Sequence, residues 1–197
     1  MPTITLALAT GNRHKAEELQ ALLSGKTQNP YHVIPYTDLI PNPPEIIEDG
    51  HTFTENALKK LAGLSATESV YFLADDSGLC IDALGGDPGV FSARYAWPET
   101  SKEALCQKVL TNMAGKTNRN AHFACVLALL KPGQPPITVE GKVFGTIAKE
   151  MLGQNGFGYD PIFIPNGFSE TFGQLPPTQK NELSHRVRAM EKLLKEL

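Results

Sequence analysis

The sequence lacks the features of a membrane-spanning or disulfide-stabilised protein. No apolar stretch reaches the ~18 residues needed to cross a bilayer, and the first residues do not combine a basic start, an apolar core and a small-residue cleavage site. Cysteine is scarce: Cys80, Cys106 and Cys125 each lie in an apolar stretch, without Cys-x-x-Cys spacing. We therefore expect a cytoplasmic protein with no membrane partner, whose cysteines are reduced core residues.

A strong excess of charge of one sign is also absent. The formal net charge of -3 argues against a nucleic-acid coat or a membrane-surface role, although it permits a locally basic pocket for an anion. The 197 residues are 41% hydrophobic and 20% charged, which is enough apolar material for one globular domain to bury its own core. No repeat, linker or low-complexity tract divides the chain, so we predict a single domain over residues 1–197.

The order of the expected elements indicates a layered α/β or α+β domain with a mixed sheet. Apolar runs and turn residues predict extended segments at 3–9, 31–36, 70–74, 79–84, 121–130 and 137–148, the last two antiparallel around the turn at 132–133. Helical spacing predicts one helix after residue 12, two helices that start at the capping boxes Thr52–Glu55 and Thr100–Glu103, and a closing helix after the loop 175–178.

The most chemically loaded segment is Asp75-Asp76-Ser77-Gly78-Leu79, directly behind the apolar run 70–74. A strand there delivers two carboxylates to its own end, which costs several kcal/mol unless a cation or a solvated cleft receives them. One interpretation is a site for a divalent metal. The other is a strand-to-turn junction, in which Asp75 caps a loop and Gly78 supplies a positive φ.

A second candidate is the segment Thr10-Gly11-Asn12-Arg13-His14-Lys15, between the first strand and the first helix. Its free N–H groups, the helix dipole and the charge of Lys15 suit a phosphate. It matches neither a Walker A loop nor Gly-x-Gly-x-x-Gly. The alternative is that Asn12 caps the helix and the basic residues are its solvated side.

Acids and bases around the second helix form a third candidate. Glu48 and Asp49 precede the helix, where they serve its dipole or reach a metal held by Asp76. Asn56 and Lys60 lie on its polar faces, where solvation is the usual role.

The last candidates lie near the carboxyl end. In the segment 153–161, the aromatic side chains of Phe157 and Tyr159 alternate with glycines and are followed by Asp160, an arrangement that suits either stacking on a base or a packed Ω-type loop. Lys180 and the segment Ser184-His185-Arg186 offer donors for keto oxygens or phosphates, or form a basic helix start on the surface.

Six motifs occur in a fixed order along the chain. They are Thr-Gly-Asn-x-x-Lys, Glu-x-Gly-x-Thr-Phe-x-Glu-Asn-Ala, Asp-Asp-Ser-Gly-Leu, Pro-Gly-x-x-Ser-Ala-Arg-Tyr, Gly-Phe-Gly-Tyr-Asp-Pro-x-Phe and Ser-His-Arg. The series resembles the inosine triphosphate pyrophosphatase family of Ham1/RdgB type, and it extends from Thr10 to Arg186.

The resemblance implies Mg²⁺-dependent hydrolysis of ITP, dITP and XTP to the monophosphate and pyrophosphate, a reaction that cleanses the nucleotide pool. It also implies an elongated, two-lobed α/β domain with a mixed central sheet flanked by helices, an active-site cleft between the lobes, and a homodimer. Asp76 is expected to accept a proton and, with Glu48, to bind Mg²⁺. Substrate contacts are expected from Thr10, Gly11, Asn12, Arg13, His14, Lys15, Lys60, Ser77, Phe157, Gly158, Tyr159, Asp160, Lys180, His185 and Arg186.

Two other functions are compatible with these residues. A Maf-like pyrophosphatase would perform the same reaction on pyrimidine or modified nucleotides. A nucleotide-binding sensor would bind without turnover, although Asp76, Glu48 and Lys15 argue for catalysis.

Overall fold

The structure is a computed structural model that describes residues 3–10, 13–27, 30–41, 43 and 46–197, apart from the side chains of residues 14 and 18. Its strands are β1 (Ile4–Leu8), β2 (Tyr31–Pro35), β3 (Val70–Ile81), β4 (Asn120–Leu130), β5 (Ile137–Ile147) and β6 (Phe163–Pro165). Its α-helices are α1 (Arg13–Leu23), α2 (Phe53–Leu61), α3 (Lys102–Asn112), α4 (Pro177–Leu183) and α5 (His185–Leu193). Among the described residues, no helix combines the length and the apolar character needed to span a membrane.

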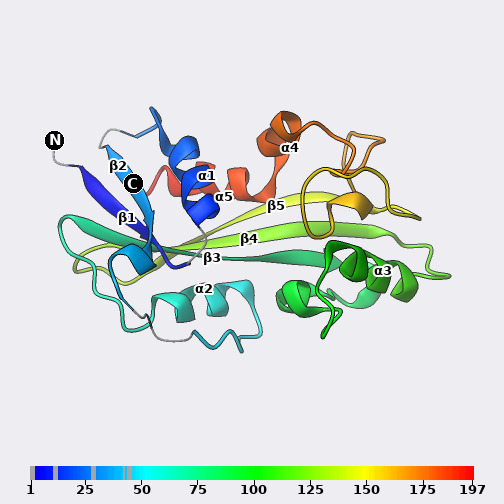
Figure 1. Cartoon of the computed structure of the whole chain (residues 1–197), viewed down its shortest axis with the longest axis horizontal. Coiled ribbons are helices and arrows are strands. Elements are labelled where there is room, and N and C mark those ends of the chain that lie inside the picture. The colour runs from blue at the N-terminus through cyan, green and yellow to red at the C-terminus, as the bar shows by residue number, and fades with distance from the viewer. Residues whose placement is uncertain (1–2, 11–12, 28–29, 42, 44–45) are drawn as a thin grey trace. The chain divides into compact units, whose positions relative to one another are not determined.

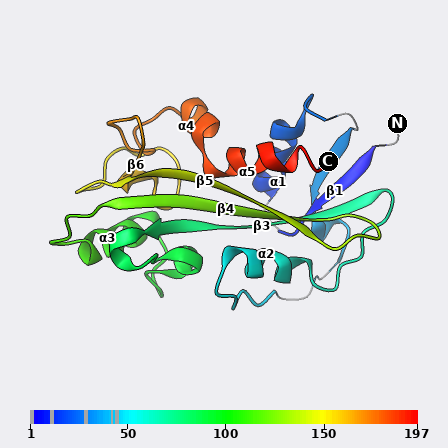
Figure 2. The same cartoon turned by 180° about the vertical axis from the view of Figure 1, so that it is seen from behind.

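The strands form one six-stranded mixed sheet in the order β2-β1-β3-β4-β5-β6 (Figures 1 and 2). β1 is parallel to both β2 and β3, whereas β5 is antiparallel to β6. β4 and β5 are neighbours joined by the short link 131–136, and such a link allows only an antiparallel pair. The predicted α/β class and mixed sheet are therefore confirmed.

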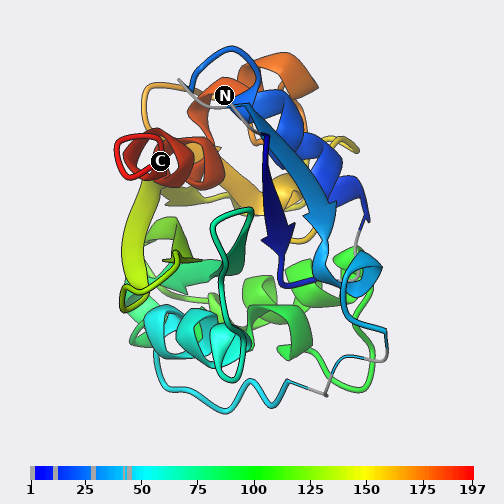
Figure 3. The same ribbon diagram turned by 90° about the vertical axis from the view of Figure 1, so that its left-hand side faces the viewer.

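The chain divides into two compact units. The first unit holds the described residues up to 76, 126–140 and 189–197, and the second holds 77–125 and 141–188. In the first unit, α1 runs alongside the β1–β2 pair (Figure 3), and a core that includes Ala7, Leu61 and Phe72 is buried. The second unit buries an aromatic core that includes Phe163 and Phe172.

The segment 75–78 was expected to end a strand, and this prediction is wrong. β3 continues through it to Ile81, and Gly78 keeps the extended backbone of the strand. The strand continues because Leu79 and Ile81, two residues apart and therefore on the same face, are both fully buried in the core of the second unit. Burial of these two side chains stabilises the extended backbone. The extended run expected to reach residue 84 ends at Ile81 and is followed by a 3₁₀ turn over Asp82–Leu84.

Two helix boundaries also differ from the prediction. α3 is capped by Ser101 rather than Thr100, because the Ser101 hydroxyl accepts the Ala104 N–H. The closing helix is divided: α4 already contains Thr178, and the extended backbone of Ser184 separates it from α5. The Ser184 hydroxyl then accepts the Val187 N–H at the start of α5, a local bond that competes with a continuous helix.

Candidate active site

Asp75 and Asp76 lie in the middle of β3, where neighbouring side chains point to opposite faces of the sheet. The lysines that pair with them come from helices on opposite faces of the sheet, since α1 lies on one face and α2 on the other (Figure 1). Asp75 pairs with Lys15 of α1, whose Nζ lies 3.2 and 3.0 Å from the two carboxylate oxygens. The register explains this contact: β1 ends with Leu8 beside Leu73, so the chain that follows β1 runs past Asp75.

Asp76 belongs to a partly buried cluster with Glu48, Asn56 and Lys60, which we call the Lys60 cluster. The Lys60 Nζ lies 3.3 Å from Asp76 Oδ1 and 3.2 Å from Glu48 Oε2, and it donates to the Asp75 carbonyl at 2.8 Å. The other Asp76 oxygen accepts a 3.1 Å hydrogen bond from Asn56 Nδ2. Two carboxylates from separate segments thus converge on a single cation.

Burial and charge act against each other in the Lys60 cluster. Desolvation raises the pKa of the Asp76 carboxyl, and the opposing effects of Lys60 and Asn56 do not cancel it. For Lys60, burial alone would lower the pKa, but the carboxylates of Asp76, Glu48 and Asp75 outweigh it and raise the pKa. Asp76 is therefore a carboxylate whose proton affinity is increased by its surroundings, as a general base requires.

The cluster offers oxygen ligands for a hard cation. Glu48 and Asp76 already share one positive charge, and carboxylates are the ligands that Mg²⁺ prefers. Within the described part of the chain, no group of three or more His, Cys, Asp or Glu side chains is arranged to hold a metal ion. Protein Mg²⁺ sites commonly use one or two carboxylates and complete the shell with water and substrate phosphates, so the residues present fit this ion.

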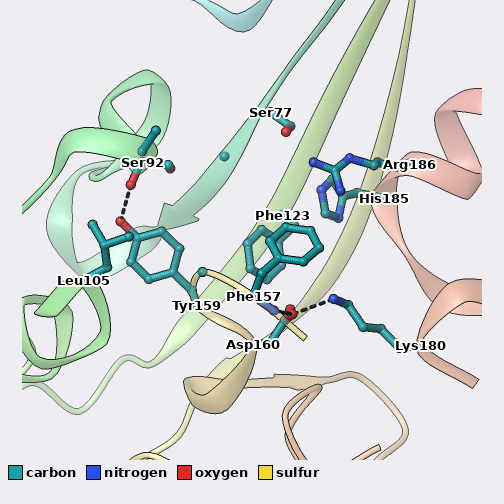
Figure 4. Close-up of a pocket in the computed structure, with 13 residues that line it drawn as sticks. Ser77, Ser92, Leu105, Phe123, Phe157, Tyr159, Asp160, Lys180, His185 and Arg186 are labelled. Atoms are coloured by element: carbon teal, nitrogen blue, oxygen red, sulfur yellow. Dashed lines mark hydrogen bonds and ion pairs between the residues drawn. The ribbon is translucent and has the colours of Figure 1, made fainter. Parts of the chain in front are cut away.

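The second unit contains a pocket with a cavity volume of about 170 Å³ (Figure 4). It is lined by Ser77, Gly78, Ser92, Ala93, Leu105, Phe123, Phe157, Gly158, Tyr159, Asp160, Lys180, His185 and Arg186. Eight of these residues were expected from the sequence to contact a substrate: Ser77, Phe157, Gly158, Tyr159, Asp160, Lys180, His185 and Arg186. The structure therefore brings the predicted residues of the second unit together.

One wall of the pocket is polar and carries cations. Asp160 is 4% exposed and accepts the Phe157 N–H at 2.7 Å and a bond from Lys180. Burial raises the pKa of Asp160, and Lys180 opposes this shift without cancelling it. The exposed ring of Phe157 has the Lys180 Nζ 4.3 Å and the Arg186 Cζ 5.1 Å from its centroid. Gly156 permits this arrangement, since its φ is +72° and a Cβ there would lie 2.0 Å from Asp160 Oδ2.

Another wall is aromatic. The His185 ring stacks on Phe123 with 5.0 Å between centroids and 13° between planes, and Phe123 also contacts Phe163 at 4.8 Å. Among the lining residues that were not expected from the sequence to contact a substrate are Ser92, Ala93, Leu105 and Phe123. Ser92 lies in the motif Pro-Gly-x-x-Ser-Ala-Arg-Tyr, which was the available signal, whereas nothing marked Phe123 among the apolar residues of β4.

The segment 10–15, which runs into the first turn of α1, is only partly described. Gly11, Asn12 and the side chain of His14 lie outside the described residues. Arg13 forms an exposed pair with Asp38 at 3.0 Å, and the Thr10 N–H donates to the Leu8 carbonyl. Asp49, the other acid before α2, pairs with Lys59 at the surface.

An α/β fold that carries a lysine–carboxylate cluster and an aromatic pocket with cationic side chains is typical of a nucleotide-handling protein. The comparisons with known proteins make this class specific. The chain belongs to the Ham1 family, whose model matches residues 6–196. The family predicted from the six motifs is thereby confirmed.

Relatives resemble the chain over nearly its whole length. It is 44% identical over 190 residues to the dITP/XTP pyrophosphatase of Shouchella clausii, covering 95% of this chain and 93% of the relative. It is 43% identical over 192 residues to the dITP/XTP pyrophosphatase of Bacillus subtilis, covering 95% and 94%. The structure of the Staphylococcus aureus Ham1 protein matches with a TM-score of 0.88 at 37% identity, covering 98% and 97%. The HAM1 protein from Coxiella burnetii matches with a TM-score of 0.86 at 40% identity, covering 100% and 98%.

Proposed function

We propose that this chain hydrolyses dITP, ITP and XTP to the corresponding nucleoside monophosphate and pyrophosphate. The geometric observation that carries the proposal is the convergence of Glu48 and Asp76 on the Lys60 ammonium. The names of the Shouchella and Bacillus relatives, both dITP/XTP pyrophosphatases, support the same reaction and substrates.

Glu48 and Asp76 would hold Mg²⁺, which when bound offsets phosphate charge and lowers the pKa of a coordinated water. Asp76 accepts the proton of the water that attacks the α-phosphorus, and its raised pKa suits this task. Asn56 keeps one Asp76 oxygen engaged, which fixes the orientation of the carboxylate. The reaction requires no covalent intermediate on the protein.

The lysines receive the phosphates. A triphosphate carries about four negative charges, and positioned cations stabilise the charge that develops on the leaving pyrophosphate. Lys60 lies beside the Asp76 carboxylate, and Lys15 lies beside the Asp75 carboxylate. We assign phosphate binding to Lys60 and to residues 10–15. Ser77, the residue after Asp76, contacts the substrate from the pocket side.

The pocket of the second unit takes the base. The donors of Lys180, His185 and Arg186 suit the 6-keto oxygen of hypoxanthine and xanthine, and the ring of Phe157 offers a stacking surface. Adenine carries a 6-amino group, which is itself a donor. Bound adenine would therefore leave a donor of the pocket without an acceptor. The pocket therefore favours deaminated purines over adenine.

Pyrophosphate release from ITP, XTP, dITP, GTP, ATP, dTTP and UTP, with Mg²⁺ and with EDTA, tests this function. We expect ITP, dITP and XTP to have the highest kcat/KM, and activity to require Mg²⁺. Faster turnover of dTTP or UTP would identify a Maf-like enzyme instead. Binding of ITP without pyrophosphate release would identify a nucleotide sensor.

The family resemblance further supports a cytoplasmic homodimer, which we include in the proposal. Light scattering after size-exclusion chromatography should give twice the 21.4 kDa mass of the chain. A monomer at micromolar concentration would contradict the dimer without affecting the proposed reaction.

A further inference from the structure

Ser92 links three segments of the second unit through hydrogen bonds. Its hydroxyl oxygen accepts the Leu79 N–H at 2.9 Å, and its O–H donates to the Gly89 carbonyl at 2.6 Å. Its carbonyl oxygen accepts the hydroxyl of Tyr159 at 2.7 Å (Figure 4). β3, the 3₁₀ turn over Gly89–Arg94 and the loop with Phe157 are thus tied to one residue.

These bonds are protected from solvent. Ser92 is 8% exposed, Tyr159 is 4% exposed and Leu79 is fully buried. Removing one partner of a buried hydrogen bond leaves the other without compensation, because water does not reach it. The links are therefore stronger determinants of local geometry than equivalent bonds at the surface.

The linked segments form walls of the same pocket. Ser77 and Gly78 line it from β3, just before Leu79, and Tyr159 lines it from the loop. The Tyr159 ring faces the pocket while its hydroxyl turns to Ser92, away from Phe123 and Phe157 (Figure 4). The Tyr159 hydroxyl thus stabilises the wall of the pocket, and the Tyr159 ring is the part that can contact a ligand.

We propose that Ser92 and Tyr159 are positioning residues that hold the β3 wall and the loop wall of the base pocket at a fixed separation. The inference rests on the proposed function, since it assigns the pocket to the base. It goes beyond that function because neither residue acts on the phosphates, and because Ser92 needs no direct contact with the nucleotide. The expected consequence is a change in base affinity that leaves the chemical step intact.

The variants Tyr159→Phe and Ser92→Ala test the two links separately. We expect each to raise the KM for ITP about tenfold, the equivalent of one lost hydrogen bond of ~1.4 kcal/mol, with kcat within about twofold of the wild type. Calorimetry should show the same factor in the Kd for ITP in EDTA, where no hydrolysis is expected. Circular dichroism melts define a temperature at which every variant is folded.

Tyr95→Phe is the matched control. It removes the same atom from a tyrosine of the same unit, whose hydroxyl accepts a 2.9 Å bond from Asn112 and which is not among the lining residues. We expect a lower melting temperature at most, with an unchanged KM. An equal rise in KM for Tyr95→Phe would show that any loosening of the unit has this effect, which would overturn the proposal.

Other results would also overturn or support the positioning role of Ser92 and Tyr159. KM and Kd within twofold of the wild type for both test variants would overturn the positioning role, as would a fall in kcat at constant KM. If the wild type binds ITP but does not hydrolyse it, the proposed reaction fails, and the Kd comparison still decides the positioning role. If Ser92→Ala does not fold, Tyr159→Phe decides alone, because it keeps the aromatic ring.

Discussion

Asn56→Asp is the sharpest test of the Lys60 cluster. Asn56 is 1% exposed; its Oδ1 accepts the Gly50 N–H at 2.8 Å, and its Nδ2 donates to Asp76 at 3.1 Å. Aspartate has the same shape and keeps the acceptor for Gly50. It replaces the donor by an oxygen, so two carboxylates face each other where a hydrogen bond had been.

The distance sets the size of the effect. Two like charges 3.1 Å apart repel by about 5 kcal/mol at an effective dielectric constant near 20. Protonating one ordinary carboxyl at pH 7 costs about 4 kcal/mol and relieves that repulsion. If both carboxyls stay charged, the lost hydrogen bond to a charged group adds about 1.5–3 kcal/mol, whereas a protonated carboxyl donates to its neighbour and keeps a hydrogen bond there. Protonation is therefore the less costly response, and we expect the free energy of unfolding to fall by up to about 4 kcal/mol at pH 7.

The pH dependence has a defined sign. Burial already raises the pKa of Asp76 in the wild type, and a second carboxylate beside it raises the pKa of the pair further. Between the ordinary carboxyl pKa and this raised value, the native state binds a proton that the unfolded state releases. The free energy of unfolding of Asn56→Asp must then fall as pH rises through that window. Its deficit relative to the wild type is smallest near pH 4 and largest at neutral pH.

Urea unfolding in EDTA at several pH values measures this deficit. Asn112→Asp is the matched control, since Asn112 donates to the Tyr95 hydroxyl, and a hydroxyl can reverse and donate to the new carboxylate. We expect less than about 1 kcal/mol of destabilisation for the control. A deficit for Asn56→Asp that equals the control, or that grows toward pH 4, would refute the assigned geometry of the cluster.

Three further predictions concern single residues of the two sites. Asp76→Asn should bind ITP but lose at least about a hundredfold in kcat, as expected for a missing general base; a near-normal kcat would remove Asp76 from this role. Lys15→Ala should weaken ITP binding about tenfold at low salt, with a smaller difference at high salt, so an unchanged affinity in both would contradict phosphate binding. Gly156→Ala should raise the KM for ITP and lower the melting temperature, because its Cβ would lie 2.0 Å from Asp160 Oδ2; wild-type kinetics would show that the loop adapts without cost.

The elements that could be predicted from the sequence are those fixed by local interactions. The capping box at α2 is an example: the Glu55 N–H donates to the Thr52 hydroxyl at 3.1 Å, and Glu55 in turn accepts the His51 N–H at 2.7 Å. Thr52 and Glu55 are the residue types of a capping box, so the sequence indicates the first bond. The second departs from the box, because Glu55 accepts from His51 rather than from the Thr52 N–H. Strand positions could also be predicted from local sequence, because an apolar run between turn residues is typical of a buried strand.

The pocket was harder to predict because it depends on contacts between distant segments. Tyr159 reaches Ser92 across 67 residues of sequence, and His185 stacks on Phe123 of another strand. A serine in a turn and a phenylalanine in an apolar strand have no local pattern that separates them from ordinary core residues. Apart from Lys180, the pocket residues that could be predicted belong to the six ordered motifs, which indicate the family without any knowledge of the contacts.

The error at residues 75–78 came from treating two adjacent acids as one unit. At a strand end, both carboxylates would have shared one site and needed a common cation. Within β3 they point to opposite faces, so Lys15 of α1 balances Asp75 while Lys60 of α2 balances Asp76. Asp76 shares its cation with a second carboxylate, that of Glu48. The alternation of a strand is therefore what divides the pair, because it leaves Asp75 to hold Lys15 and commits Asp76 to the side where metal and water are proposed to bind.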